Sequence, residues 1–161
     1  MPQDSRKNYN AKVPRSSCTC GSLRRASRRV SQFYDTALAP TGIKSTQYSI
    51  LLELDRDRDG AGITMRELAM VMVMDRSTLG HNLRPLQREN LLALRLSALD
   101  RRRRYVELTR KGRVKLQRAR RLWRAAEGRF ETIFGKRHAA DLRAVLHSIA
   151  SSDELNSLPL D

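Results

Sequence analysis

The segment MRELAMVMVMDRSTLGHNLRPLQRENLLALRLSALDRRRRYVELT, residues 65–109, decides the fold of this 161-residue chain. Its apolar spacing predicts two short helices followed by a basic β-hairpin. Asp75 precedes a run of leucines at helical spacing, so its carboxylate is placed to cap the first free amides of the second helix. Those leucines are Leu79, Leu83 and Leu86.

The helix before Asp75 needs an inward face. Leu68 and Ala69 supply it, together with Val71 or Met72. Two short helices joined by so tight a connection form a helix-turn-helix. The methionines of residues 70–74 are interpreted as packing residues, because thioethers fill irregular spaces in cores far more often than they bind metals.

The second helix is expected to be a recognition helix. Its exposed face would meet base edges and phosphates in the major groove of duplex DNA. The predicted contact residues are Arg76, Ser77, Thr78, His81, Asn82 and Arg84. His81 is either such a contact or a solvent-facing histidine, and Pro85 is expected to bend the helix near its C-terminal end.

Two strands are predicted next, at residues 91–96 and 103–108, around a polar turn. The tip carries charged residues that would be drawn to phosphate and to a narrow minor groove. They are Asp100, Arg101, Arg102, Arg103 and Arg104. Asp100 can hold Arg102 by a charge-assisted pair. Which arginine enters the groove is left open because neighbours on a strand point to opposite faces, and the plain alternative is a soluble basic loop.

The charge balance indicates a polyanionic partner. The chain has 32 Lys and Arg residues against 17 Asp and Glu residues, a formal net charge of +15 that exceeds what solubility requires. An aromatic content of 5% favours duplex DNA over single-stranded RNA, whose bases stack on aromatic side chains. No stretch approaches the roughly 20 apolar residues of a membrane span. We therefore expect a cytoplasmic protein with no membrane partner.

The segments before residue 65 have patterns of their own. Residues 1–17 are polar and lack a period, which predicts a disordered basic arm. Helices are expected at residues 18–39, ended by Pro40 and Gly42, and from Ser45 or Thr46 to Asp55. The alternating aspartates that follow resemble the start of a calcium loop. Position 66 is Arg where that loop needs a bidentate glutamate, so the run is interpreted as an ordinary loop.

Thr109 is expected to cap a helix running to about Phe134, with an apolar stripe too long for a small winged-helix core. A last helix, about residues 139–151, has a further apolar face. With the first helix, these predict a homodimer that places two recognition helices on a pseudo-palindromic site, about one turn apart. Trp123 is either a core or interface residue or part of a ligand cavity. The apolar positions are Ala119, Leu122, Trp123, Ala126, Phe130, Ile133, Phe134, Leu142, Val145, Leu146 and Ile149.

These elements resemble the MarR family of bacterial transcription regulators over roughly residues 20–149. The matching segments are Gln47-Tyr48-Ser49-Ile50-Leu51, Glu67-Leu68-Ala69, Met74-Asp75-Arg76-Ser77-Thr78, Asp100-Arg101-Arg102 and Leu108-Thr109-Arg110-Lys111-Gly112. The last two are the most specific. Two positions depart from the family, Val73 and Asn90, where it often has glycine. Asn tolerates the left-handed helix-ending conformation, and Val has no such tolerance.

The resemblance implies a mainly α fold within one unit, residues 18–161. A winged helix-turn-helix with a β-hairpin wing would occupy about residues 45–109, and dimerisation helices about residues 18–39 and 110–155. It also implies that Asp100 orients a wing-tip arginine toward the minor groove. Effectors in the family are often small aromatic acids or phenols bound between the dimer helices and the winged helix.

Cys18 and Cys20 are the features that could specify a signal. Two cysteines without a histidine cluster do not supply the roughly four soft ligands of zinc. A helix N-terminus and the nearby arginines lower a thiol pKa, which predicts an oxidisable thiolate; the alternative is a buried, inert cysteine in the dimer interface. The chain also resembles the organic-hydroperoxide-sensing branch of the family. Cys20 matches its reactive cysteine and Tyr34 one of the tyrosines that hydrogen-bond it, whereas the second tyrosine falls at Ser45.

Two functions follow from these observations. The first is a dimeric, sequence-specific DNA-binding regulator, a repressor released by a small ligand or by thiol oxidation. The second is an architectural protein that binds DNA largely without sequence preference. No glycine-rich phosphate loop, nucleophile-base pair or metal-ligand set occurs, so we expect no enzyme activity, metal or cofactor.

Overall fold

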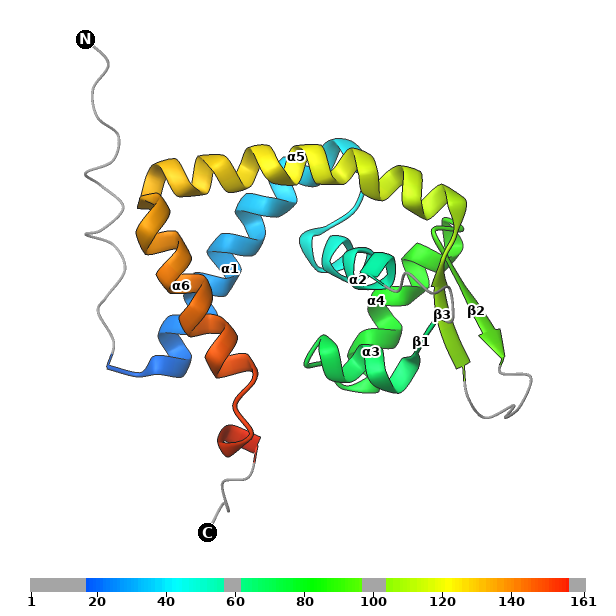
Figure 1. The fold of residues 1–161 in the computed structure, drawn as a ribbon, viewed down its shortest axis with the longest axis horizontal. Helices are drawn as coiled ribbons and strands as arrows, with labels where there is room; N and C mark the ends of the chain where they lie inside the picture. The colour runs from blue at the N-terminus through cyan, green and yellow to red at the C-terminus, as the bar shows by residue number, and fades with distance from the viewer. Residues whose placement is uncertain (1–16, 57–61, 97–103, 157–161) are drawn as a thin grey trace.

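The computed structural model describes residues 17–56, 62–96 and 104–156, and these form a mainly helical chain with a small sheet (Figure 1). The predicted arm, apart from Ser17, and the hairpin tip lie outside the described residues. The elements are α1 (Thr19–Leu38), η2 (Ala39–Thr41), α2 (Ser45–Arg56), β1 (Ile63–Thr64), α3 (Met65–Val71), α4 (Arg76–Arg88), β2 (Leu92–Leu96), β3 (Arg104–Leu108), α5 (Arg110–Phe134), α6 (Lys136–Ala150) and η3 (Glu154–Asn156).

Helix α5 runs along the whole molecule and joins two lobes (Figure 1). At its N-terminal end lie α2, α3, α4 and the sheet, which form a winged-helix lobe. At its C-terminal end lie α1 and α6, which form a helical lobe. The expected fold class, a winged helix-turn-helix with long N- and C-terminal helices, is therefore confirmed.

The core of the winged-helix lobe is built from the residues that the apolar spacing predicted. Leu79, Leu83 and Leu86 of α4 are buried, as are Leu68 and Ala69 of α3. Burying a leucine side chain is worth about 1.5–3 kcal/mol, so this face holds α4 against α2 and the sheet. The fully buried set also includes Leu38, Ile50, Leu51, Leu91, Val106 and Leu116.

The methionine-rich segment is divided between core and surface. Met72 and Met74 pack against the core, and Met72 rather than Val71 completes the inward face of α3. The packing interpretation is wrong for Met70, which is 67% exposed. The helical periodicity places Met70 two positions from Leu68, on the opposite side of the helix.

The sheet is antiparallel with the strand order β1-β3-β2. Strands β2 and β3 form the predicted hairpin, with Leu92 opposite Leu108 and Leu94 opposite Val106. Strand β1 was not predicted, because two residues are too few to show an alternating pattern. It pairs Ile63 with Val106 and thereby attaches the start of α3 to the wing.

The two departures from the family pattern occupy the two left-handed positions of the described chain outside glycine. Val73 has a φ of 49° in the turn between α3 and α4, and Asn90 has a φ of 56° after α4. Left-handed backbone costs an L-residue roughly 1–2 kcal/mol, and Asn bears it best. The turn at Val73 is held by the Met74 N–H, which donates to the Ala69 carbonyl at 2.9 Å.

The Leu108–Gly112 motif joins the wing, the recognition helix and α5. Thr109 Oγ1 caps α5 by accepting from the Gly112 N–H at 3.0 Å, and the same hydroxyl donates to the Asn90 carbonyl at 2.7 Å. The Thr109 N–H donates to the Leu91 carbonyl at 3.1 Å. Gly112 lies so close to the backbone of Leu91, the residue before β2, that an added Cβ would be 2.0 Å from the Leu91 carbonyl oxygen.

Polar side chains attach the other elements to α5. Lys111 donates to the Glu89 carbonyl at 2.7 Å and Lys115 pairs with the Glu89 carboxylate at 2.8 Å, at the end of α4. Asp55 of α2 pairs with Arg113 at 3.4 Å and Arg120 at 2.8 Å. Asp55, where the predicted helix ends, lies one residue before the end of α2, and its two ion pairs with α5 were not predicted.

The helical lobe has its own polar cluster. Glu127 of α5 accepts a hydrogen bond from the Tyr34 hydroxyl of α1 at 2.5 Å and pairs with Arg143 of α6 at 2.5 Å. Arg143 also pairs with Glu131 at 3.2 Å. These contacts fix the angle at which α6 leaves α5.

We expect Gly112→Ala to destabilise the fold by about 3 kcal/mol, because the new methyl group collides with backbone rather than with a movable side chain. Urea unfolding at fixed protein concentration measures this change. Gly128→Ala is the matched control: it lies in the same helix with nothing within 4 Å of an added Cβ. The control should stabilise the protein by roughly 0.5–1 kcal/mol. Equal stability of the two variants would show that the close approach is not required.

Candidate nucleic-acid interface

The N-terminus of α4 is organised by Asp75, as the sequence predicted. The Asp75 carboxylate accepts from the Thr78 N–H at 2.8 Å and from the Thr78 hydroxyl at 2.6 Å. The hydroxyl and backbone hydrogen bonds from Thr78 lower the pKa of Asp75 below its usual value. The cap holds the first turn of α4 in place, with its neighbours Arg76 and Ser77 exposed.

The predicted contact residues of α4 lie on or beside its exposed face. Arg76, Ser77, Thr78, His81 and Arg84 are exposed, and Asn82 is half-buried. Two of these side chains also have internal partners: Thr78 donates to Asp75, and the Asn82 amide donates to the Thr78 carbonyl at 2.9 Å. We therefore expect Arg76, His81 and Arg84 to reach furthest toward a ligand.

Arg88 extends the same face and was missed by the sequence analysis. It lines a shallow hollow on α4 together with His81, Arg84, Pro85 and Gln87. Residues 81, 84 and 88 recur at three- and four-residue steps, which is the signal that would have found Arg88. Helix α4 continues through Pro85 to Arg88, and proline leaves the His81 carbonyl without its helical donor.

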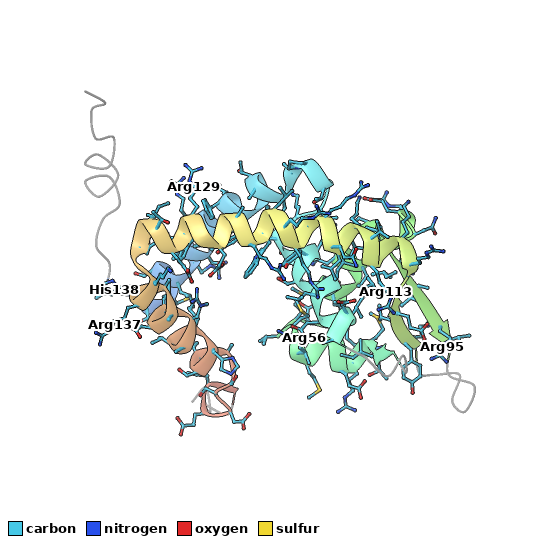
Figure 2. The ribbon with its side chains drawn as sticks, turned by 45° about the horizontal axis from the view of Figure 1, so that its top comes forward. Arg56, Arg95, Arg113, Arg129, Arg137 and His138 are labelled. Carbon is cyan, nitrogen blue, oxygen red and sulfur yellow. The ribbon has the colours of Figure 1, made fainter. Side chains whose placement is uncertain are left out.

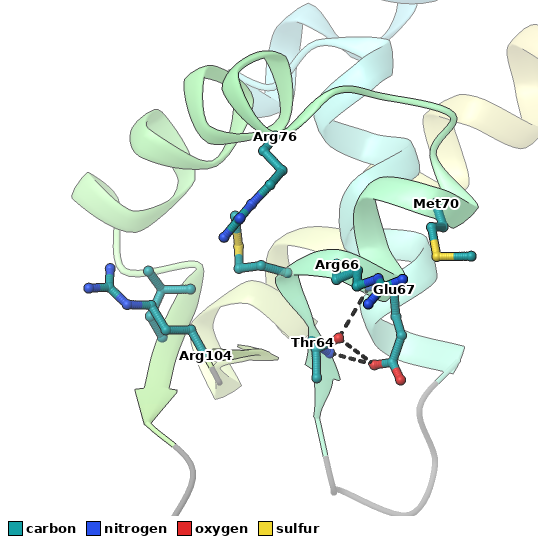
Figure 3. Close-up of a pocket in the computed structure, with 8 residues that line it drawn as sticks. Thr64, Arg66, Glu67, Met70, Arg76 and Arg104 are labelled. Atoms are coloured by element: carbon teal, nitrogen blue, oxygen red, sulfur yellow. Dashed lines mark hydrogen bonds between the residues drawn. The ribbon is translucent and has the colours of Figure 1, made fainter. Parts of the chain in front are cut away.

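A second hollow lies between α3, the start of α4 and the wing (Figure 3). Arg66, Arg76 and Arg104 border it from three different elements. Arg66, at the start of α3, was also missed. The start of α3 is rigid, because Thr64 and Glu67 form a capping box in which the Thr64 N–H donates to Glu67 at 2.9 Å. The other lining residues are Met65, Met70 and Leu94.

Only part of the wing falls within the described chain. Arg104 is exposed at the start of β3, while Asp100, Arg101, Arg102 and Arg103 lie outside the described residues. The strands that lead to the tip are cross-linked by Arg95, whose Nε donates to Glu107 at 2.6 Å. The Arg95 guanidinium also lies 5.3 Å from the centre of the Tyr105 ring. These contacts stiffen the described part of the hairpin.

The cysteines lie at the N-terminus of α1. Cys18 is the N-cap residue and its sulfur accepts from the Gly21 N–H at 3.3 Å. Both cysteines are exposed in this chain and neither is in a disulfide. Tyr34 lies fourteen residues further along the same helix, about 21 Å at 1.5 Å per residue. One chain therefore does not bring Tyr34 to Cys20.

Tyr34 instead belongs to an aromatic stack at the base of the helical lobe. Burial, and then its hydrogen bond to Glu127, raise the pKa of Tyr34 far above its ordinary value. Trp123 stacks between Tyr34 and Tyr48, with ring centres at 6.1 and 5.8 Å. Trp123 is thus a packing residue between the two lobes. Ser45, where the second sensing tyrosine would fall, donates through its N–H and hydroxyl to Asp35, each at 2.6 Å.

Within residues 17–56, 62–96 and 104–156, no group of three or more His, Cys, Asp or Glu side chains is placed to hold a metal ion. No helix in the same part of the chain has the length and apolarity needed to cross a membrane.

The capped helix α4, the adjoining wing and the arginines around them define a winged-helix protein of the kind that presents a recognition helix. Comparison with known proteins narrows this class. The family model described as "MarR family" matches residues 41–103, which include α2, α3, α4 and β2. No curated protein matches the sequence significantly.

Solved structures match nearly the whole chain. The transcriptional regulator MosR of M. tuberculosis, crystallised with DNA, is 34% identical, with 88% of this chain and 99% of that chain covered and a TM-score of 0.74. The repressor CouR, from Rhodococcus jostii RHA1, bound to a 23-mer DNA duplex, is 30% identical, with 83% and 92% covered and a TM-score of 0.74. This protein belongs to the MarR family of transcription regulators.

We expect Asp75→Ala to lower stability in a pH-dependent way. The folded-state pKa of Asp75 is lowered, so its stabilisation is present above the unfolded pKa of about 3.9 and is lost as the pH falls through the folded value. The free energies of unfolding of the wild type and the variant, measured in urea, should therefore differ at pH 7, and the difference should shrink as the pH falls below about 4. Asp75→Asn, a neutral cap, is the control without titration. A difference that stays constant over this range would contradict the assignment.

Proposed function

We propose that this protein is a dimeric, sequence-specific duplex-DNA-binding regulator that acts in the cytoplasm as a repressor, released by a small ligand or by thiol oxidation. The observation that carries the proposal is the exposed face of α4. Arg76, His81, Arg84 and Arg88 lie along it. Arg and His side chains at these positions match the donors that read base edges and phosphates in the major groove.

The relatives support duplex DNA as the partner. The MosR crystals contain DNA and CouR is a repressor seen on a DNA duplex. The hollow bordered by Arg66, Arg76 and Arg104 would accept the phosphate backbone beside the groove. We further propose that the wing tip, with Arg101, Arg102 and Arg103, reaches the adjacent minor groove.

The helical lobe supports a homodimer. All of α6 except Ala139 is exposed, although Leu142, Val145, Leu146 and Ile149 share one of its faces. Ile133 and Phe134 at the end of α5 are 60% and 56% exposed. An apolar surface of this extent is costly in water, and a second copy would cover it with the same surface. A two-fold dimer then sets two α4 helices on a pseudo-palindromic site.

The signal that releases DNA is either a small ligand or the oxidation of a thiol. CouR has been crystallised with p-coumaroyl-CoA, which supports a small aromatic ligand. The exposed thiols of Cys18 and Cys20 support oxidation. Because the Cys18 sulfur accepts the Gly21 N–H, any bond that moves this sulfur also removes the N-cap of α1, a helix of the dimerising lobe. Oxidation would in this way disturb the dimer.

A second function, an architectural protein with little sequence preference, is favoured by the net charge of +15. Charge alone produces DNA binding with a steep dependence on salt and no choice among sequences. The capped and cross-linked α4 and wing favour the specific regulator, because a rigid reading face is unnecessary for binding by charge.

The deciding experiment titrates reduced protein against a pool of random duplexes near physiological salt, and repeats this after mild treatment with an organic hydroperoxide. We expect enrichment of a palindrome, and loss of this preference in Arg84→Ala at a cost of about 1–3 kcal/mol in specific binding. If oxidation abolishes the enrichment in the wild type but not in Cys20→Ser, the signal is assigned to the thiol. If oxidation leaves the enrichment unchanged in the wild type, the signal is assigned to a ligand. No enrichment at all would leave the architectural function.

We expect Leu142→Asp with Val145→Asp to separate the dimer, because two carboxylates would be buried in an apolar interface. Sedimentation velocity measures the change, and operator affinity should fall with it. Ala140→Asp with Ala144→Asp is the matched control, since it adds the same charge on the opposite face of α6. A double variant at Leu142 and Val145 that remains dimeric would show that α6 is not the interface.

A further inference from the structure

Helix α5 carries more positive charge than its internal contacts use. Nine of its 25 residues are Lys or Arg and two are Glu. Four of the nine are engaged: Lys111 and Lys115 bind Glu89, and Arg113 and Arg120 bind Asp55. The other five are Arg110, Arg118, Arg121, Arg124 and Arg129.

These five arginines, here called the outer arginine row, are all exposed. At 100° per residue they fall within an arc of about 140° on one side of α5, and they span about 28 Å along it. None of them is in an ion pair with another residue of the described chain. The two acidic residues of α5 lie outside this arc, Glu131 by about 20° and Glu127 by about 60°, and both bind Arg143.

The outer arginine row lies on the side of α5 away from the winged-helix lobe. Figure 2 shows Arg129 pointing outward from α5, while Arg113 lies on the side of α2, with which it pairs. In Figure 1 the strands of the wing extend from the N-terminal end of α5 to the opposite side of the molecule. The wing and the outer arginine row therefore point in different directions.

We propose that the outer arginine row binds the phosphate backbone of a second DNA duplex, so that one protein molecule holds two duplex segments at once. This inference goes beyond the proposed function, because the recognition of an operator by α4 does not need these residues. The second contact would have no sequence preference, since an arginine on phosphate carries no base information.

The chemistry of the row favours phosphate over an isolated carboxylate. All five side chains are arginine rather than lysine, and the guanidinium fork matches two phosphate oxygens. A straight helix of about 28 Å follows about eight base-pair steps of a duplex at 3.4 Å each. The residues between the arginines on this face, Val114, Gln117, Ala125 and Gly128, are uncharged, so nothing on the face repels a polyanion.

Repulsion between the two duplexes does not prevent this arrangement. At physiological salt the Debye length is about 8 Å. Helix α5 alone is about 10–12 Å thick with its side chains, and the winged-helix lobe lies between it and the first duplex. The two backbones are therefore separated by more than one Debye length, and the screened repulsion is small.

The test is a capture assay with full-length protein. One duplex is immobilised, saturated with protein and washed, and a labelled second duplex is then added. We expect the wild type to retain the second duplex. Arg118→Gln/Arg121→Gln/Arg129→Gln should reduce this retention at least tenfold while binding of the first duplex changes less than twofold. The slope of log affinity against log salt for the second duplex should fall by about 2.7, at about 0.9 for each phosphate contact.

A charge-matched control separates the row from net charge. Arg28→Gln/Lys136→Gln/Arg137→Gln removes three exposed cations from α1 and α6 and should leave capture unchanged. Equal loss in both triple variants, or no capture by the wild type, would overturn the proposal. So would displacement of the second duplex by polyglutamate at a lower charge concentration than by duplex DNA, because the row would then suit an acidic protein.

A further variant makes the inference independent of operator recognition. Arg76→Gln/Arg84→Gln impairs the recognition face and leaves the outer arginine row intact. This variant should lose its preference among sequences but keep a salt-sensitive, sequence-independent affinity that the three α5 substitutions then reduce. If the α5 substitutions have no effect in this background, the row does not bind DNA, whatever the outcome for operator binding.

Discussion

The contact between Thr109, Gly112 and the Leu91 carbonyl is the constraint on which the rest of the structure depends. It places the start of α5 directly against the end of α4 and the first residue of the wing. Only glycine allows this approach, since a Cβ would lie 2.0 Å from a backbone oxygen. The end of α4 and the start of the wing therefore meet the helix that leads to the rest of the molecule at one rigid point, which Lys111 and Lys115 strengthen through Glu89.

Because this junction is rigid, a change in the direction of α5 also moves α4, the recognition helix. At the other end of α5, Glu127 binds both Tyr34 of α1 and Arg143 of α6. A change in the helical lobe is therefore carried along a 25-residue helix rather than lost in a loop. Regulation of DNA binding by a ligand or an oxidant would need such a connection, because an effector can act only by favouring one arrangement of the two α4 helices over another.

Charge is distributed to match this architecture. Acidic residues are used to attach elements to α5: Asp55 holds α2, Glu89 holds α4 and Glu127 holds α6. With the carboxylates committed in this way, arginines remain exposed on α4, at the wing and along the outer side of α5. Exposed cations also lie on α1 and α6, but those on α4, the wing and α5 are gathered on faces where several arginines can act on one polyanion.

Local signals in the sequence alone determined the helix caps at Asp75 and Thr109, the inward leucines of α4, the hairpin and the family, because each depends on residues within about one turn of one another. Tertiary structure alone decided what depends on distant partners. Arg66 comes beside Arg76 and Arg104 only once α3, α4 and the wing pack together, and Asp55 becomes an ion-pair partner only beside α5. It also placed Tyr34 on Glu127 rather than near Cys20 within one chain, since no local pattern encodes a contact ninety-three residues away.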